Sequence, residues 1–201
     1  AAMSHLRLGH SSEAETIFRQ VMDINAGNAQ AIKGMAQIAF ASRRYSEAET
    51  YYGKLSELYP ENKNYILNKA VSQLCDGKPE EGMAVIFRLD YEYPEDNNVR
   101  RALAWGQLLK GEARKASDIY DALIADGRCI RADFLNSAYT RWFVGNMGAA
   151  VDRLREYVSY NGDNMGYEEL ETAIAEDRNV LEAYGITGPE MKIMTDLVFG
   201  S

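Results

Sequence analysis

Residues 43–70 read RRYSEAETYYGKLSELYPENKNYILNKA, and residues 77–104, which begin 34 positions later, read GKPEEGMAVIFRLDYEYPEDNNVRRALA. Aligned without a gap, the two stretches place small residues opposite small ones, large apolar residues opposite large apolar ones, and proline opposite proline. The matching pairs are Ala48 with Gly82, Tyr52 with Ile86, Leu55 with Leu89 and Pro60 with Pro94. A period of 34 residues therefore organises this part of the chain.

The same period continues in both directions and holds through five units without an insertion. Large apolar residues spaced by three and four positions share one face of a helix, and small residues lie where two helices approach closely. The small columns are Ala14, Ala48, Gly82, Ala116, Ala150 and Ala2, Ala36, Ala70, Ala104, Ala138; the large columns are Phe18, Tyr52, Ile86, Tyr120, Leu154 and Val21, Leu55, Leu89, Leu123, Tyr157. Each unit is therefore predicted to be a hairpin of two antiparallel helices.

The ends of these expected helices carry local signals. Glycine readily adopts the positive φ that ends a helix, and one turn column contains glycine in every unit but one. This column reads Gly9, Arg43, Gly77, Gly111 and Gly145. The Ser-x-x-Glu spacing of Ser12 with Glu15, and of Ser46 with Glu49, predicts capping boxes at the starts of second helices. Pro79 is typical of a first helical turn.

Together these columns resemble the tetratricopeptide repeat family, with departures at the fourth place of the unit and at the closing proline. The departures are Ile32, Ile66, Arg100 and Phe134 at the fourth place, and Arg128 and Gly162 in place of proline. The resemblance covers residues 1–162 and implies an all-α fold, an α-solenoid superhelix of about five helical hairpins. The units are 1–28, 29–62, 63–96, 97–130 and 131–164. Because the first unit is incomplete, we expect the natural protein to continue upstream.

After Gly162 the columns fail, but helical periodicity continues. One helix is expected from Tyr167 to Ala183, and a second is indicated by the cap, proline and acid at Thr187, Pro189 and Glu190. From residue 161 to the end there are nine acidic and two basic residues. Residues 165–201 are therefore expected to form acidic capping helices for the array, with a docking surface for a basic partner as the alternative.

Catalytic and metal-binding chemistry has little support in the sequence. His5 and His10 lack a metal-ligand spacing, and Cys75 and Cys129 are far apart and are expected to be buried thiols. Residues 161–166 resemble a calcium loop only in part, because Met165 occupies a ligand position. We expect no enzyme activity, no cofactor and no metal.

The charge distribution bears on the class of partner. The net charge is −8, but residues 1–160 hold 21 acidic and 20 basic residues, so the array is close to neutral. Nucleic acid is not expected as a partner, because no basic stripe is present to bind phosphates. No apolar run is long enough to span a membrane. Nothing in the sequence indicates a cellular compartment.

By resemblance to the family, the first helices line a concave groove that binds a peptide or protein segment. The groove residues implied are Lys33, Gln37, Asn64, Asn68, Asn98, Arg101, Trp105, Tyr139, Trp142 and Phe143. Amides can hydrogen-bond a peptide backbone, and aromatic rings can receive apolar side chains. A two-carboxylate clamp of the kind some relatives use is disfavoured: Lys33 and Asn68 match it, but Gln37, Asn98 and Ala102 depart from it.

Other interpretations of the groove residues and of the chain remain open. Trp105 and Trp142 could equally pack between neighbouring hairpins. The chain could also be a structural or assembly module that acts by self-association into a homo-oligomer or by docking through its ends, where the last expected helix is rather apolar. A third interpretation is an auxiliary domain of a larger protein.

Overall fold

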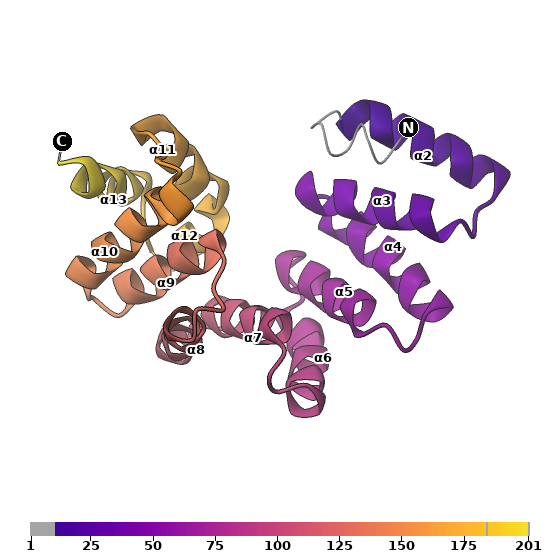
Figure 1. The fold of residues 1–201 in the computed structure, drawn as a ribbon, viewed down its shortest axis with the longest axis horizontal. Coiled ribbons are helices and arrows are strands. Elements are labelled where there is room, and N and C mark those ends of the chain that lie inside the picture. Colours follow the sequence, from indigo (N-terminus) through magenta and orange to yellow (C-terminus); the bar gives the residue numbers. More distant parts are fainter. Residues whose placement is uncertain (1–10, 184, 201) are drawn as a thin grey trace. The chain divides into compact units, whose positions relative to one another are not determined.

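The computed structural model describes residues 11–183 and 185–200, and the regular structure of these residues is helical throughout. The predicted all-α class is therefore confirmed. The chain divides into two compact units, Ala1–Glu95 (unit 1) and Asp96–Ser201 (unit 2). Figure 1 shows that each unit is built from successive helices packed as hairpins.

Unit 1 contains α2 (Ser11–Ile24), α3 (Ala29–Ala41), α4 (Tyr45–Leu58), α5 (Lys63–Cys75) and α6 (Pro79–Glu92). Its small columns lie where helices meet: Ala14, Ala48 and Ala36 are fully buried. A Cβ atom added to Gly82 on α6 would lie 2.6 Å from the carbonyl oxygen of Ala70 on α5. The close helix approach inferred from the small columns is thus observed directly.

Unit 2 contains α7 (Asn97–Leu109), α8 (Ala113–Ala125), α9 (Arg131–Phe143), α10 (Met147–Val158), the short 3-10 helix η1 (Tyr160–Gly162), α11 (Tyr167–Glu176), α12 (Arg178–Ala183) and α13 (Gly188–Phe199). Leu170, Ile174, Leu181 and Met194 of the last three helices share one buried cluster with α7 to α10. The C-terminal helices are thus part of the core of unit 2. The single helix expected over residues 167–183 is wrong, because the chain turns at Asp177 between α11 and α12.

The turns between paired helices follow the glycine column. Gly77, Gly111 and Gly145 have φ values of 76°, 81° and 80°, and Arg43 takes φ 59° in their place. Gly9 lies outside the described residues, as do His5 and His10. Glycine adopts a positive φ without steric strain because it has no Cβ atom, whereas Arg43 has a Cβ atom and is strained in this conformation.

The helix starts agree with prediction in part. Pro79 begins α6, and the Thr187 N–H donates to Glu190 Oε2 at 2.7 Å in a capping box. The capping box predicted for Ser46 and Glu49 is wrong, because α4 begins at Tyr45 and Ser46 lies inside its first turn. The other predicted box is also wrong, because α2 already includes Ser12 and its hydroxyl donates to Glu13.

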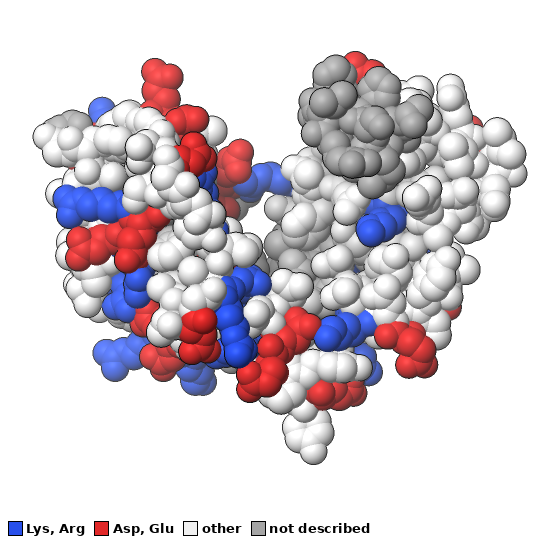
Figure 2. All heavy atoms as spheres, viewed as in Figure 1, with Lys and Arg blue, Asp and Glu red and all other residues white. Residues whose placement is uncertain are grey.

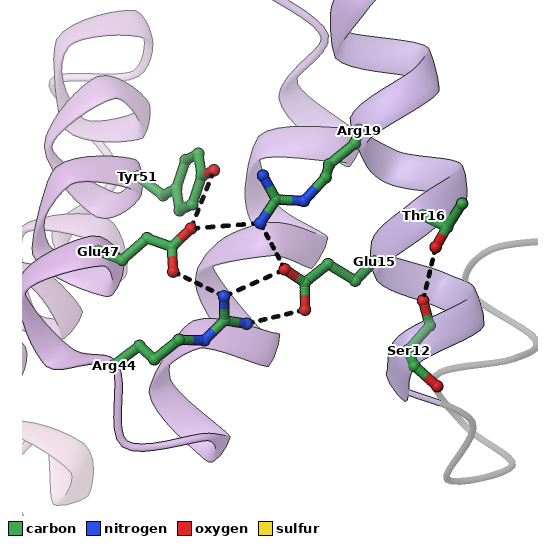
Figure 3. A network of polar contacts seen from close by, with 7 residues as sticks. All are labelled: Ser12, Glu15, Thr16, Arg19, Arg44, Glu47 and Tyr51. Carbon is green, nitrogen blue, oxygen red and sulfur yellow. Dashed lines mark hydrogen bonds and ion pairs between the residues drawn. The ribbon is translucent and has the colours of Figure 1, made fainter.

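Glu15 and Glu49, the two glutamates of the capping boxes that do not form, instead link successive hairpins of unit 1. Glu15 of α2 accepts hydrogen bonds from Arg44, in the turn before α4, at 2.8 and 3.1 Å, and from Arg19 at 2.6 Å. Arg44 also binds Glu47 at 2.8 Å, as Figure 3 shows. The hydrogen bond from Arg44 is the main reason why the pKa of Glu15 is lowered.

The same link recurs one unit later. Lys78 donates to Glu49 at 2.8 Å, and Glu49 also accepts from Gln73 at 2.9 Å. Both cysteines, predicted as buried thiols, are half-buried, and neither is in a disulfide. None of the helices in the described part of the chain is long and apolar enough to cross a bilayer.

Candidate functional site

Four polar side chains lie on the first helices of the two complete hairpins of unit 1. Lys33 and Gln37 are four residues apart on α3, and Asn64 and Asn68 are four residues apart on α5. Residues at this spacing share one face of a helix. Lys33 and Asn64 are exposed, and Gln37 and Asn68 are half-buried.

The apolar side of these helices explains why the four residues face outward. Ile32, Met35 and Ala36 of α3 are buried, as are Leu67 and Ala70 of α5. With this side fixed in the core, the remaining face of each helix carries the polar residues. Within residues 11–183 and 185–200, none of the four side chains hydrogen-bonds another residue. We call these four residues, Lys33, Gln37, Asn64 and Asn68, the polar face of unit 1.

In unit 2, by contrast, the corresponding charged residue is used internally. Arg101 Nε donates to both oxygens of Asp133, at 2.8 and 3.0 Å, and Asp133 is 1% exposed. Arg101 also donates to the Arg128 carbonyl and, at 3.2 Å, to Asn98 Oδ1. The second Asp133 contact is the N–H of Ile130 at 2.9 Å, which fixes the start of α9. Arg101 and Asn98 therefore stabilise unit 2.

The aromatic residues predicted for the groove lie in or against the core of unit 2. Tyr139 is fully buried and Trp142 is 7% exposed, while Trp105 and Phe143 pack against the same cluster. The Tyr139 hydroxyl donates to Asp177 Oδ2 at 3.1 Å. Burial, with the neighbouring Asp177 charge, raises the pKa of Tyr139 well above its ordinary value. Tyr139 of α9, which was expected to line an open groove, is thus buried and hydrogen-bonded to Asp177.

Unit 1 also has an open hollow that the repeat columns did not predict. It has a volume of about 670 Å³ and is lined by Leu58, Tyr59, Pro60, Glu61, Asn62, Lys63 and Tyr93. The ring centroids of Tyr59 and Tyr65 are 6.0 Å apart, and Lys63 Nζ lies 4.4 Å from the centroid of Tyr93. The sequence held a signal for it, since a Tyr-Pro pair recurs at 59–60 and 93–94. We call it the tyrosine hollow.

Neither a basic patch on the face that Figure 2 presents nor a metal site is seen among the described residues. Figure 2 shows Lys and Arg side chains interspersed with Asp and Glu on the face that it presents. Among the described residues, no group of three or more His, Cys, Asp and Glu side chains is placed to hold a metal ion. The absence of a nucleic-acid partner stays a prediction.

A profile of the tetratricopeptide repeat matches residues 5–70. Solved structures of the same repeat class cover almost the whole chain. Residues 5–70 therefore match the tetratricopeptide repeat family, and the chain as a whole resembles proteins of this repeat class in its fold. No curated protein matches the sequence significantly.

Three solved structures illustrate this likeness in fold. PilW, a type IV pilus biogenesis factor, is 16% identical with a TM-score of 0.67, over 97% of this chain and 87% of that one. A tetratricopeptide repeat protein from Parabacteroides merdae is 13% identical with a TM-score of 0.69, over 98% and 81%. YrrB, described as having an unusual peptide-binding site, is 15% identical with a TM-score of 0.52, over 81% and 84%. At these identities the likeness concerns the fold alone.

Proposed function

We propose that this protein is a non-catalytic interaction scaffold that binds a peptide segment of a partner protein on the polar face of unit 1. One observation carries the proposal. The four side chains of this face are exposed or half-buried and have no partner among the described residues. In unit 2, Arg101 and Tyr139 occupy the repeat positions of Lys33 and Gln37, and both form hydrogen bonds within the unit.

The chemistry of the face suits a peptide. Each peptide residue offers one backbone donor and one acceptor, and the amides of Gln37, Asn64 and Asn68 can pair with both. Lys33 adds a cation for an acidic side chain of the ligand. Because none of these side chains has a hydrogen-bond partner among the described residues, no such bond has to be broken before a peptide binds.

The tyrosine hollow offers apolar contacts near the start of α5, the helix that carries Asn64 and Asn68. Lys63, which lines the hollow, directly precedes Asn64 in the chain. Tyr59 and Tyr93 are 47% and 39% exposed, and tyrosine supplies rigid contact area at a low cost in conformational entropy. A peptide with an apolar residue beside its polar backbone contacts fits this arrangement.

The family supports the class of function. Tetratricopeptide arrays act through protein partners, and YrrB is described as having a peptide-binding site. The pilus-biogenesis proteins among the similar structures add no partner for this chain, because their likeness extends only to the fold.

Selection from a displayed peptide library against the full chain tests the proposal. The affinity of a selected peptide is measured by calorimetry for the chain and for a variant with Lys33, Gln37, Asn64 and Asn68 replaced by alanine. The control replaces one lysine and three amides elsewhere on the exposed surface, namely Lys54, Gln20, Asn164 and Asn179. We expect about a tenfold or greater loss of affinity in the first variant only. Equal affinities, or no selected peptide at all, would refute the proposal.

A second candidate function is self-association through α13. Ile193, Leu197 and Phe199 are 46%, 44% and 40% exposed there, and exposed apolar patches mark interaction sites. Light scattering over a concentration series checks it. A mass that rises with concentration in the chain but not in a variant with Ile193 and Leu197 replaced by serine supports this function; a constant monomer mass contradicts it.

A further inference from the structure

A second, smaller hollow in unit 1 lies between α4, α5 and α6. Its volume is about 280 Å³. It is lined by Ser56, Pro60, Ile66, Lys69, Ala70, Gln73, Val85 and Arg88. This volume is just below the range of small-molecule sites and suits one or two side chains of a peptide.

The hollow lies on the opposite side of α5 from the polar face. Successive residues of an α-helix are rotated by about 100°, so Ile66, Ala70 and Gln73 point roughly opposite to Asn64 and Asn68. The two surfaces are therefore distinct, and a ligand of one does not reach the other through the same α5 face.

The residues that line the hollow carry positive charge only. Lys69 is half-buried, Arg88 is exposed, and no carboxylate is among the lining residues. The charge of Lys69 is among the causes that lower the pKa of Glu49, after burial, which acts to raise it, and the hydrogen bonds from Lys78 and Gln73. Both oxygens of Glu49 are already taken by Gln73 and Lys78. Within the described part of the chain, neither Lys69 nor Arg88 forms a hydrogen bond or an ion pair.

The repeat shows that Lys69 is unusual at its place. The equivalent positions in the other complete units hold Met35, Leu103 and Ser137, of which Met35 and Ser137 are fully buried. A half-buried lysine without an ion-pair partner stabilises a helical hairpin less than methionine does. Its presence here points to a ligand outside the hairpin.

Apolar residues also line the hollow, namely Pro60, Ile66, Ala70 and Val85. A ligand that satisfies both features carries an anionic group beside an apolar one. We infer that this hollow binds an acidic side chain of a partner peptide, with a neighbouring apolar side chain against Ile66 and Val85. Charge-assisted hydrogen bonds from Lys69 and Arg88 hold the carboxylate. This site is independent of the polar face and goes beyond the proposed function.

Nuclear magnetic resonance of the isotopically labelled full chain tests the site. The probe is the capped tripeptide acetyl-Leu-Glu-Leu-amide, and the comparison peptide has Gln in place of Glu. We expect saturable shifts of the amide signals of Ser56, Ile66, Ala70 and Val85 with the Glu peptide, and an affinity weaker by about tenfold for the Gln peptide.

Three variants separate the site from general charge effects. Lys69→Met places the residue of the equivalent position of the preceding unit, so the hairpin keeps its packing, and Arg88→Met removes the second cation independently. Lys54→Met makes the same charge change on the exposed surface of α4. We expect Lys69→Met and Arg88→Met each to weaken binding of the Glu peptide and Lys54→Met to leave it unchanged.

Several outcomes would overturn the inference. These are the absence of saturable shifts at the four amides, equal shifts with the Gln peptide, or equal weakening by Lys54→Met. Inorganic phosphate is titrated as a further arm. Tighter binding of phosphate than of the Glu peptide would show a site for a small anion and would overturn the peptide assignment.

Discussion

Arg44 binds Glu15 through two hydrogen bonds, Nη1 to Oε1 at 3.1 Å and Nη2 to Oε2 at 2.8 Å, across a sequence separation of 29 residues. The Lys78 to Glu49 bond spans the same separation one unit later. In both cases a glutamate on one second helix meets a cation in the turn before the next second helix. The repeat thus carries a recurring ionic link between hairpins, in addition to its apolar columns.

The Glu15–Arg44 pair should contribute measurable coupling to the stability of unit 1. Their side chains are 20% and 36% exposed, so we expect a coupling energy of about 0.5–1 kcal/mol. A double-mutant cycle with Glu15→Gln and Arg44→Met measures it. Hydrogen exchange of the α3 and α4 amides reports unit 1 specifically. Strictly additive effects of the two substitutions would contradict the link.

The pH dependence of unit 1 should follow the two linked glutamates. Hydrogen bonds from Arg44 and then Arg19 lower the pKa of Glu15. For Glu49, burial acts to raise the pKa, but the hydrogen bonds from Lys78 and Gln73 outweigh it and the pKa is lowered. Both carboxylates therefore bind protons less readily in the folded chain than in the unfolded chain.

Their stabilisation is fully present above the ordinary glutamate pKa of 4.5 and is lost as the pH falls through the lowered folded values. We expect unit 1 of the Glu15→Gln, Glu49→Gln double variant to lose less stability than the wild-type unit between about pH 6 and about pH 3. The stability of unit 1 in both proteins is measured at both pH values by hydrogen exchange of the α3 and α4 amides. An equal loss in both proteins would exclude these two glutamates as its source.

Gly82 should not tolerate a methyl group. A Cβ atom there would lie 2.6 Å from the Ala70 carbonyl oxygen, so we expect Gly82→Ala to cost about 1–3 kcal/mol. Gly148 on α10 has no neighbour within 4 Å of the same added atom, and Gly148→Ala should stabilise by about 0.5–1 kcal/mol. Chemical unfolding of both variants compares the signs. Stabilisation by Gly82→Ala would show that α5 and α6 do not approach so closely.

Arg101 should act on stability, since Asp133 would be left buried and unpaired without it. Arg101→Met is expected to destabilise unit 2 by about 3 kcal/mol. Arg114→Met, at an exposed position of α8, should change stability by less than about 0.5 kcal/mol. Both tryptophans, Trp105 and Trp142, lie in unit 2, so tryptophan fluorescence follows its unfolding selectively. A neutral Arg101→Met would mean that the buried pair is not needed.

The sequence predicted the repeating architecture because its signal is periodic and local. Small and large columns at helical spacing specify hairpins, and the positive φ of Gly77 follows from glycine chemistry alone. Arg43 shows that the turn geometry is set by the hairpin and persists where the glycine is missing.

The candidate site was less predictable from the sequence. A position in the repeat indicates toward which side of its helix a side chain points, but it does not indicate whether that side chain hydrogen-bonds another residue of the chain. The bond from Arg101 to Asp133 joins residues 32 positions apart, and that from Tyr139 to Asp177 joins residues 38 apart. Neither pairing has a local signature. The capping box predicted from the spacing of Ser46 and Glu49 was wrong for a similar reason. Glu49 accepts a hydrogen bond from Lys78 of the next unit and does not cap the start of α4.

The central claim, that a peptide binds on the polar face of unit 1, is tested most directly by photo-crosslinking. A library-selected peptide carries a benzophenone group, and mass spectrometry identifies the cross-linked residues of the full chain. We predict cross-links to α3 and α5 within or beside Lys33, Gln37, Asn64 and Asn68, abolished by excess unlabelled peptide. Competed cross-links confined to α7 to α13 would contradict the account.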